Sequence, residues 1–263
     1  MRRIERCCKL VAFLVYFNVG RTLIFAHNRF YDFILQHNNV FDELSRCSSV
    51  FCLGAGTGAE LTGIIAAWLR CRKDESTTPT SLEQDRGAIL PPPSVSCSPN
   101  RNPIRIHIQD VCDYTSCVGE LTTAMAQWSI PLVETRFTIA DAASPNSEEY
   151  MTTHIAESDI VTSFFILNEL LESDKSGFVR LMTRMVTHMK QNALWIVIDS
   201  AGSFSSHHVG KGDYMAYTFL DMLTGFTILA KSDACWYRVP ASLSYPTPLQ
   251  NSRYYYRILC KHA

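Results

Sequence analysis

The sequence lacks several patterns that would assign it quickly to a structural class. None of its ten cysteines forms a C-x-x-C pair, which argues against a zinc ribbon. No cluster of carboxylates stands out either, so we expect no metal. A small disulfide-stapled fold is disfavoured, because 263 residues with 47% hydrophobic content can fill a sizeable core. We therefore expect mostly buried or free thiols in an intracellular, reducing compartment.

The sequence also has little net charge and no apolar run long enough to span a bilayer. A net charge of -1 gives no bulk attraction to nucleic acid, although it leaves room for a local basic face. The run from Leu10 to Phe17 resembles a short signal peptide, but it has only eight apolar residues and no A-x-A-like cleavage site follows. We expect a packed N-terminal helical segment over residues 1–46 and no membrane partner.

The most informative feature is a glycine-rich turn between a strand pattern and a helix pattern. An apolar run from Val50 to Leu53 leads into three glycines at alternate positions, and helical spacing begins at Leu61. Glycines permit a tight turn and let the backbone approach a ligand closely. This order predicts a nucleotide-binding corner. Its expected cofactor-binding residues are Leu53, Gly54, Ala55, Gly56, Thr57 and Gly58.

Residues 71–103 interrupt the regular pattern. They hold six of the eleven prolines and show no apolar period, so we expect a disordered insertion. Beyond it, apolar runs predict strands at 104–108, 133–139, 159–165 and 194–198, helices near 115–128, 175–190 and 213–223, and a closing antiparallel pair at 234–239 and 254–260. The alternation predicts an α/β fold over residues 47–263, a doubly wound, Rossmann-like, seven-stranded sheet with a terminal antiparallel strand pair.

Two aspartates follow predicted strands. Asp110 lies 52 positions after Gly58, and leaving out the 33 residues of 71–103 brings this separation to 19. A ribose-binding carboxylate is expected about 20 residues after the glycines in such folds. Asp141 follows the next strand, where its carboxylate and the backbone of Ala142 are placed to meet an adenine amino group. A helix cap is an equal alternative for Asp141.

This order of features resembles the class I S-adenosylmethionine-dependent methyltransferases. The glycine motif, Asp110, Asp141 and the closing strand pair all fall in that family's order. The resemblance implies S-adenosylmethionine as the cofactor and a methyltransferase domain over 47–263. The sequence departs from the family at one position. Two residues before the first glycine, where the family usually carries an acid, this sequence has Cys52. The resemblance thus implies either weaker binding of the methionine amine or another group in that role.

A closer resemblance lies in the segments 163–171 and 197–204, which with 53–60 are similar to the fungal 25S ribosomal RNA uridine-N3 methyltransferase family. This implies methyl transfer to N3 of a uridine in large-subunit ribosomal RNA, in the nucleus, nucleolus or cytoplasm. The partner would be ribosomal RNA or a pre-ribosome. Local basic residues are candidates for phosphate contacts: Arg70, Arg72, Lys73, Arg253, Arg257 and Lys261.

Other methyl-transfer chemistries lack their signatures. No Pro-Cys dipeptide supplies a C5-pyrimidine nucleophile, and no D/N-P-P-Y/F run follows the fourth strand. Methylating an imide nitrogen needs alignment and loss of the N–H proton. We expect Asn168 to hydrogen-bond a uracil carbonyl and Glu169 to accept the proton, with Asp199 as a third catalytic candidate. The alternative is that Asn168 caps a helix and Glu169 faces solvent.

Two other functions stay open from the sequence. Gly54-x-Gly56-x-x-Ala59 also satisfies the relaxed fingerprint of nicotinamide-dependent oxidoreductases, but no tyrosine is followed four residues later by lysine. A degenerate methyltransferase fold that serves as an interaction module is favoured by Cys52 and opposed by the three glycines and Asp110.

Overall fold

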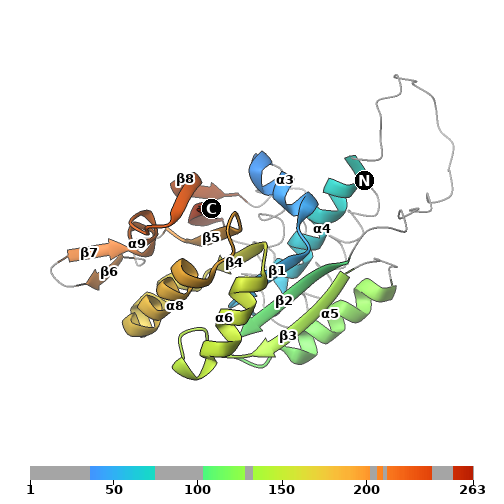
Figure 1. The fold of residues 1–263 in the computed structure, drawn as a ribbon, viewed down its shortest axis with the longest axis horizontal. Coiled ribbons are helices and arrows are strands. Elements are labelled where there is room, and N and C mark those ends of the chain that lie inside the picture. Colours follow the sequence, from blue (N-terminus) through green and yellow to red (C-terminus); the bar gives the residue numbers. More distant parts are fainter. Residues whose placement is uncertain are drawn as a thin grey trace, which may run out of the picture.

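A mixed β-sheet with helices on both faces forms the body of the protein (Figure 1). The computed structural model describes residues 36–74, 103–127, 133–201, 206–209, 212–238 and 251–262. The sheet has seven strands in the order β3-β2-β1-β4-β5-β9-β8. These strands are β1 (Ser49–Leu53), β2 (Ile104–Asp110), β3 (Val133–Ile139), β4 (Ile160–Phe164), β5 (Leu194–Ser200), β8 (Phe226–Tyr237) and β9 (Ser252–Lys261).

The first five strands of the sheet are parallel and the last two are antiparallel, as the sequence predicts. Every residue of β1 and β4 is buried, because helices cover both faces of these central strands. In β2 the buried residues Ile104, Ile106 and Ile108 alternate with more exposed ones at the start of the strand. All five parallel strands end at the same edge of the sheet, where the glycine turn also lies.

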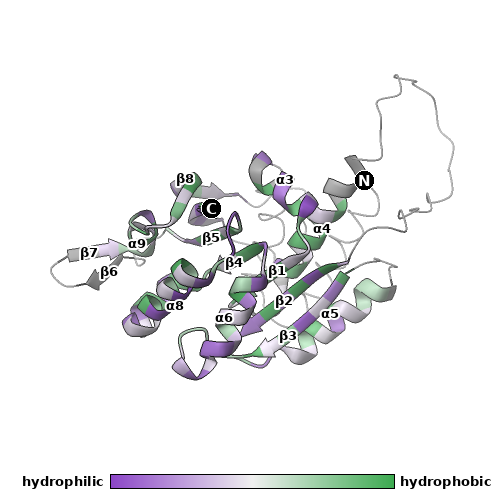
Figure 2. Ribbon diagram, viewed as in Figure 1, coloured by the Kyte–Doolittle hydropathy of each residue, from purple (hydrophilic) through white to green (hydrophobic). Residues whose placement is uncertain are grey.

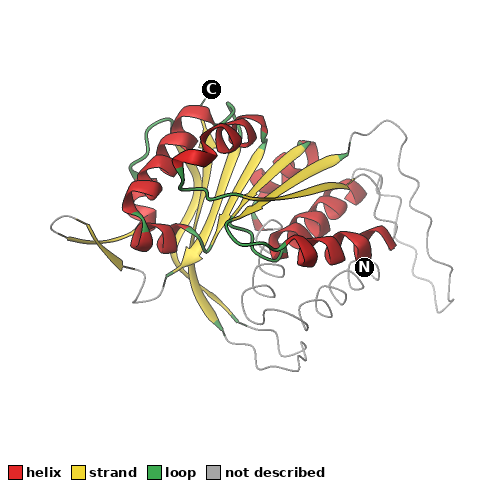
Figure 3. Cartoon of the chain, turned by 90° about the horizontal axis from the view of Figure 1, so that it is seen from below, coloured by secondary structure: helices red, strands yellow, loops and turns green. Residues whose placement is uncertain are grey.

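The helices divide into two groups, one on each face of the sheet (Figure 3). Apolar side chains of α3 (Asn38–Arg46), α4 (Ala59–Asp74) and α5 (Thr115–Gln127) form one buried cluster with the sheet. The other cluster contains α6 (Glu148–Glu157), α7 (Leu167–Ser173), α8 (Lys175–His188) and α9 (Ala216–Asp221). Figure 2 shows hydrophobic residues concentrated in the central strands, between helices whose faces are mixed, as the packing of helices on both faces of a sheet requires. None of the described helices is long and apolar enough to cross a membrane.

Several elements differ from the sequence expectations. Helix α4 continues to Asp74, past the expected start of the insertion at 71, and residues 75–102 lie outside the described residues. Of the expected N-terminal helical segment, α3 lies in the described part and residues 1–35 do not. Two elements were not expected: helix α6 and a separate hairpin of β6 (Ser206–Val209) and β7 (Gly212–Met215). Helix α9 is shorter than the expected helix near 213–223, and β8 starts at Phe226 instead of at residue 234.

A buried arginine connects the terminal strand pair to α9. Arg257 of β9 has no exposed surface, and its guanidinium pairs with Asp221 at 2.6 Å and Asp233 at 2.7 Å. Its Cζ atom also lies 4.5 Å from the centre of the Tyr217 ring. Arg257 is therefore a structural residue, and the expectation that it contacts phosphates is wrong. The Nζ of Lys261 is likewise engaged, with the carbonyl of Val186.

Candidate active site

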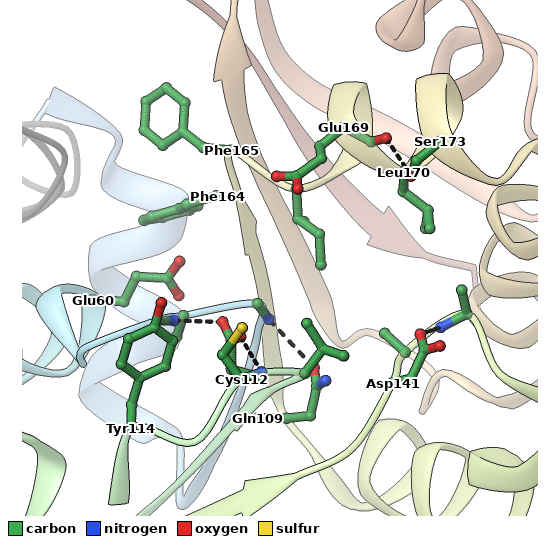
Figure 4. A pocket seen from close by; sticks show the side chains of 18 of the residues that line it. Glu60, Gln109, Cys112, Tyr114, Asp141, Phe164, Phe165, Glu169, Leu170 and Ser173 are labelled. Atoms are coloured by element: carbon green, nitrogen blue, oxygen red, sulfur yellow. Dashed lines mark hydrogen bonds between the residues drawn. The ribbon is translucent and has the colours of Figure 1, made fainter. Parts of the chain in front are cut away.

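A pocket of about 570 Å³ opens at the carboxyl ends of the parallel strands. Figure 4 shows Glu60, Tyr114 and Phe164 on one side of it and Asp141 on the opposite side. Side chains from the ends of β1 to β4 and from the starts of α4 and α7 meet here. The lining residues include Gly54, Ala55, Gly56, Thr57, Glu60, Gln109, Asp110, Cys112, Tyr114, Asp141, Ala142, Phe164, Phe165 and Glu169. Of the predicted cofactor residues, Leu53 and Gly58 are buried beside the pocket but do not line it.

The glycine turn has backbone angles that favour glycine. Gly54 has φ 63° and Gly56 has φ 53°, both in the left-handed region that L side chains rarely adopt. A Cβ atom at Gly54 would lie 2.5 Å from Cδ1 of Ile166, whereas one at Gly56 would meet open space. Gly54 thus allows close packing of the turn against the loop after β4, and Gly56 keeps the pocket wall free of side chains.

Asp110 holds the glycine turn while facing the pocket. Its Oδ2 accepts a hydrogen bond from the backbone N–H of Gly56 at 2.9 Å, and its Oδ1 accepts one from Cys112 at 2.9 Å. A carboxylate has about four acceptor positions, so two remain for ligand hydroxyls. Across the pocket, Oδ1 of Asp141 accepts from the backbone N–H of Ala143 at 2.8 Å. This bond fixes the loop that carries Ala142.

Gln109 joins three strand ends, a role that the sequence did not reveal. Its Oε1 accepts from the backbone N–H of Gly54 at 3.3 Å, and its Nε2 donates to the carbonyl of Ala140. The side chain is 1% exposed. It therefore fixes the ends of β1, β2 and β3 relative to one another beneath the pocket.

Glu60 is a second lining residue without a sequence-based assignment. It is only 1% exposed, and its Oε2 accepts from the hydroxyl of Thr162 at 2.6 Å. Burial raises the pKa of this carboxyl from 4.5 to about 8, and the nearby charge of Asp110 adds to the increase. The residue lies in the first turn of α4, directly after the glycines.

The three predicted catalytic residues separate into two groups. Glu169 lines the pocket and is exposed. Asn168 and Asp199 are buried behind it and bond to each other: the backbone N–H and Nδ2 of Asn168 each donate to the Asp199 carboxylate at 3.0 Å. Nδ2 also donates to the carbonyl of Ser200 at 2.8 Å. The Asn168 amide nitrogen thus faces β5, in contrast to the expected contact with a uracil carbonyl.

Phe165 has an unusual backbone at the end of β4. Its φ is 58°, which is costly for a bulky side chain, and its N–H donates to the carbonyl of Ile198 at 2.9 Å. Strained residues of this kind concentrate at functional sites. Both Phe165 and the preceding Phe164 line the pocket, so two aromatic side chains and the Glu169 carboxylate belong to the same cavity at the edge of the sheet.

Residues 22–260 match a family model described as "Putative SAM-dependent methyltransferase". The chain belongs to this family. The methyltransferase is also 24% identical over 234 residues to the 25S rRNA (uridine(2843)-N(3))-methyltransferase of Saccharomyces cerevisiae. That alignment covers 82% of this chain and 61% of the yeast protein, so the chain spans about three fifths of its relative's length.

Solved methyltransferase structures resemble this methyltransferase at low sequence identity. The N-methyltransferase NodS of Bradyrhizobium japonicum, in complex with S-adenosyl-L-homocysteine, is 11% identical with a TM-score of 0.48, and 98% of each chain is covered. An S-adenosylmethionine-dependent methyltransferase of Clostridium acetobutylicum is 11% identical with a TM-score of 0.47, and the comparison covers 90% of this chain and 92% of that one.

The cofactor of this methyltransferase is S-adenosylmethionine. The pocket suits a ligand that carries hydroxyls, an amine and positive charge. Gly56 leaves open space, and the carboxyl groups of Glu60, Asp110, Asp141, Glu169 and Asp174 line the cavity. Membership in this family sets aside the oxidoreductase alternative. Within the described residues, no group of three His, Cys, Asp or Glu side chains is arranged to hold a metal ion.

Proposed function

We propose that this methyltransferase modifies N3 of a uridine in large-subunit ribosomal RNA. The observation that carries the proposal is the 24% identity, over 82% of the chain, to a yeast protein named for that activity. Because the chain spans 61% of that relative, both the substrate and the partner are inferences. The partner would be ribosomal RNA or a pre-ribosome, met in the nucleolus, nucleus or cytoplasm.

The two phenylalanines at the end of β4 support a base as the substrate. The N3 edge of a paired uridine is occupied, so the base must be unpaired or turned out of its helix before it reacts. Splayed bases commonly stack on aromatic side chains. Phe165 lines the pocket from a backbone conformation that its surroundings must enforce, which favours a role in holding the base.

We assign different roles to the three catalytic candidates. When bound, the cofactor supplies an electrophilic methyl group, and the uracil must lose its N3 proton to accept it. Glu169 is the proton acceptor in this proposal, because its exposed carboxylate lines the same pocket as Phe165. Asn168 and Asp199 are positioning residues, since their mutual hydrogen bonds hold the first turn of α7, which carries Glu169.

Deletion of the gene tests this proposal. Large-subunit RNA from the deletion strain is digested to nucleosides, and 3-methyluridine is quantified by mass spectrometry. We expect the modified nucleoside to fall and to return when the wild-type gene is restored. An undiminished amount, in a strain without a duplicate gene, would eliminate this substrate and leave the methyltransferase assignment intact.

Complementation with variants of α7 tests the role of Glu169. Glu169→Gln removes the proton acceptor and should lower turnover on the RNA about 100-fold, within the range for loss of a general base. Glu172→Gln makes the same change at an exposed position of α7 that does not line the pocket, and should retain activity. Equal activities of the two variants would reject Glu169 as the acceptor.

A further inference from the structure

The carboxyl of Glu60 is buried in the wall of the cofactor pocket without a basic partner. Among the described residues, no lysine, arginine or histidine forms an ion pair with it. Its contacts are the hydroxyl of Thr162 and the thiol of Cys52. Buried carboxylates are normally paired with a cation or held neutral, because burial penalises the charged form.

The position of Glu60 links it to the acid that is missing at Cys52. Cys52 of β1 and Thr162 of β4 are direct neighbours in the parallel register, and the Glu60 carboxyl contacts both side chains. Burial raises the pKa of the Cys52 thiol well above its usual range, so this thiol stays neutral. Glu60 therefore places a carboxyl, carried by the first turn of α4, beside Cys52, where β1 itself has no acidic residue.

The pocket faces a ligand that carries positive charge. S-adenosylmethionine has an ammonium group on its methionine moiety and a sulfonium centre. Two carboxyls line the glycine end of the pocket. The Asp110 carboxylate accepts hydrogen bonds from the backbone N–H groups of Gly56 and Cys112. The Glu60 carboxyl has only the Thr162 hydroxyl and the Cys52 thiol as partners among the described residues. An ammonium group would supply both the counter-charge and the hydrogen-bond donors that a buried carboxylate requires.

We propose that Glu60 binds the ammonium group of the methionine moiety of S-adenosylmethionine, in place of the acid that Cys52 lacks. The inference rests on the cofactor part of the proposed function and extends it to a named residue. The carboxyl releases its proton to solvent when the ammonium binds, and the position of Glu60 in the first turn of α4 also favours the resulting negative charge.

Calorimetric titration with two probes tests the inference. S-adenosyl-L-homocysteine keeps the ammonium group and lacks the sulfonium, whereas 5′-methylthioadenosine keeps the adenosine and lacks the whole amino acid. Glu60→Gln should weaken binding of S-adenosyl-L-homocysteine at least about tenfold and leave 5′-methylthioadenosine within about twofold. Gln can still accept from Thr162, so the fold should persist, as a melting temperature no lower than that of the wild type would verify. Glu157→Gln, at the exposed end of α6 on the far edge of the sheet, is the matched control.

Each other outcome has a defined meaning. Unchanged affinity for S-adenosyl-L-homocysteine, or equal weakening of both probes, would overturn the assignment of Glu60 to the ammonium. In a parallel titration with S-adenosylmethionine, weaker binding of that ligand alone would overturn the assignment as well and would point to the sulfonium. If neither probe binds the wild-type protein, cofactor use itself fails, which is a separate result from failure of the Glu60 assignment.

Discussion

Ionisation of Glu60 couples the pocket to the stability of the whole fold. Its pKa is about 8 in the folded protein against an ordinary value of 4.5, because burial favours the neutral form. Thr162 and Cys52 oppose this increase through hydrogen bonds, and Asp110 adds to it by repulsion. Between these two pH values the unfolded chain has lost the proton and the folded chain retains it. The contribution of neutral Glu60 to stability is therefore complete below about pH 4.5 and is lost as the pH rises through about 8.

Replacing Glu60 by glutamine should remove this pH dependence. We expect the free energy of unfolding of Glu60→Gln, relative to wild type, to increase with pH between 5 and 8, by up to about 1.4 kcal/mol per pH unit. Urea unfolding at several pH values measures it. A constant difference across this range would mean that the Glu60 carboxyl titrates normally.

At the level of single residues, the sequence located two aspartates of the pocket where a function imposes a spacing, and their roles in cofactor binding stay predictions. The separation between the glycines and Asp110 placed that residue on the pocket, and the end of the third strand placed Asp141 there. Gln109 and Glu60 were missed because nothing in their local pattern distinguishes them from solvated polar residues. Their importance arises from strand register and helix placement, which bring them against residues 31 to 102 positions away.

At the level of elements, the contact between α7 and β5 is open to a direct test. The Asp199 carboxylate accepts from the backbone and side-chain N–H groups of Asn168 and from the N–H of Ser200. Asp199→Ala leaves these buried donors unsatisfied, so the free energy of unfolding should fall by about 1–3 kcal/mol in urea titrations. Asp42→Ala, at an exposed position of α3, should change it by less than about 0.5 kcal/mol. Equal effects of the two changes would contradict this account.

Which elements could be predicted depended on how apolar they are. The strands β1, β4 and β5 are mostly apolar and almost completely buried, and their parallel direction was predicted correctly. Helix α6 was missed because only Met151 and Ile155 are buried in it, too few to form a recognisable stripe. The early part of β8 was missed because its more buried and its more exposed positions differ little in hydrophobicity.

At the level of the whole molecule, the fold should tolerate loss of most of the proline-rich segment. Its composition cannot bury a core, and the closure entropy of a loop grows slowly with its length. We expect that a short Gly/Ser linker in place of residues 77–101, between α4 and β2, will change the melting temperature by no more than about 2–4 °C. Differential scanning calorimetry would check this. A larger decrease would show that the segment packs against the domain.

The strand order has a further consequence for synthesis and turnover. β9 is the last strand along the sequence, yet it lies between β5 and β8 and is the neighbour of both. While the nascent chain is emerging, the apolar edge of β5 and the whole of β8 must wait unpaired until β9 is made. An exposed strand edge of this kind attracts other chains and proteases. A premature stop before the codons for β9 would therefore leave two strands without this partner, and we expect such a product to be aggregated or degraded.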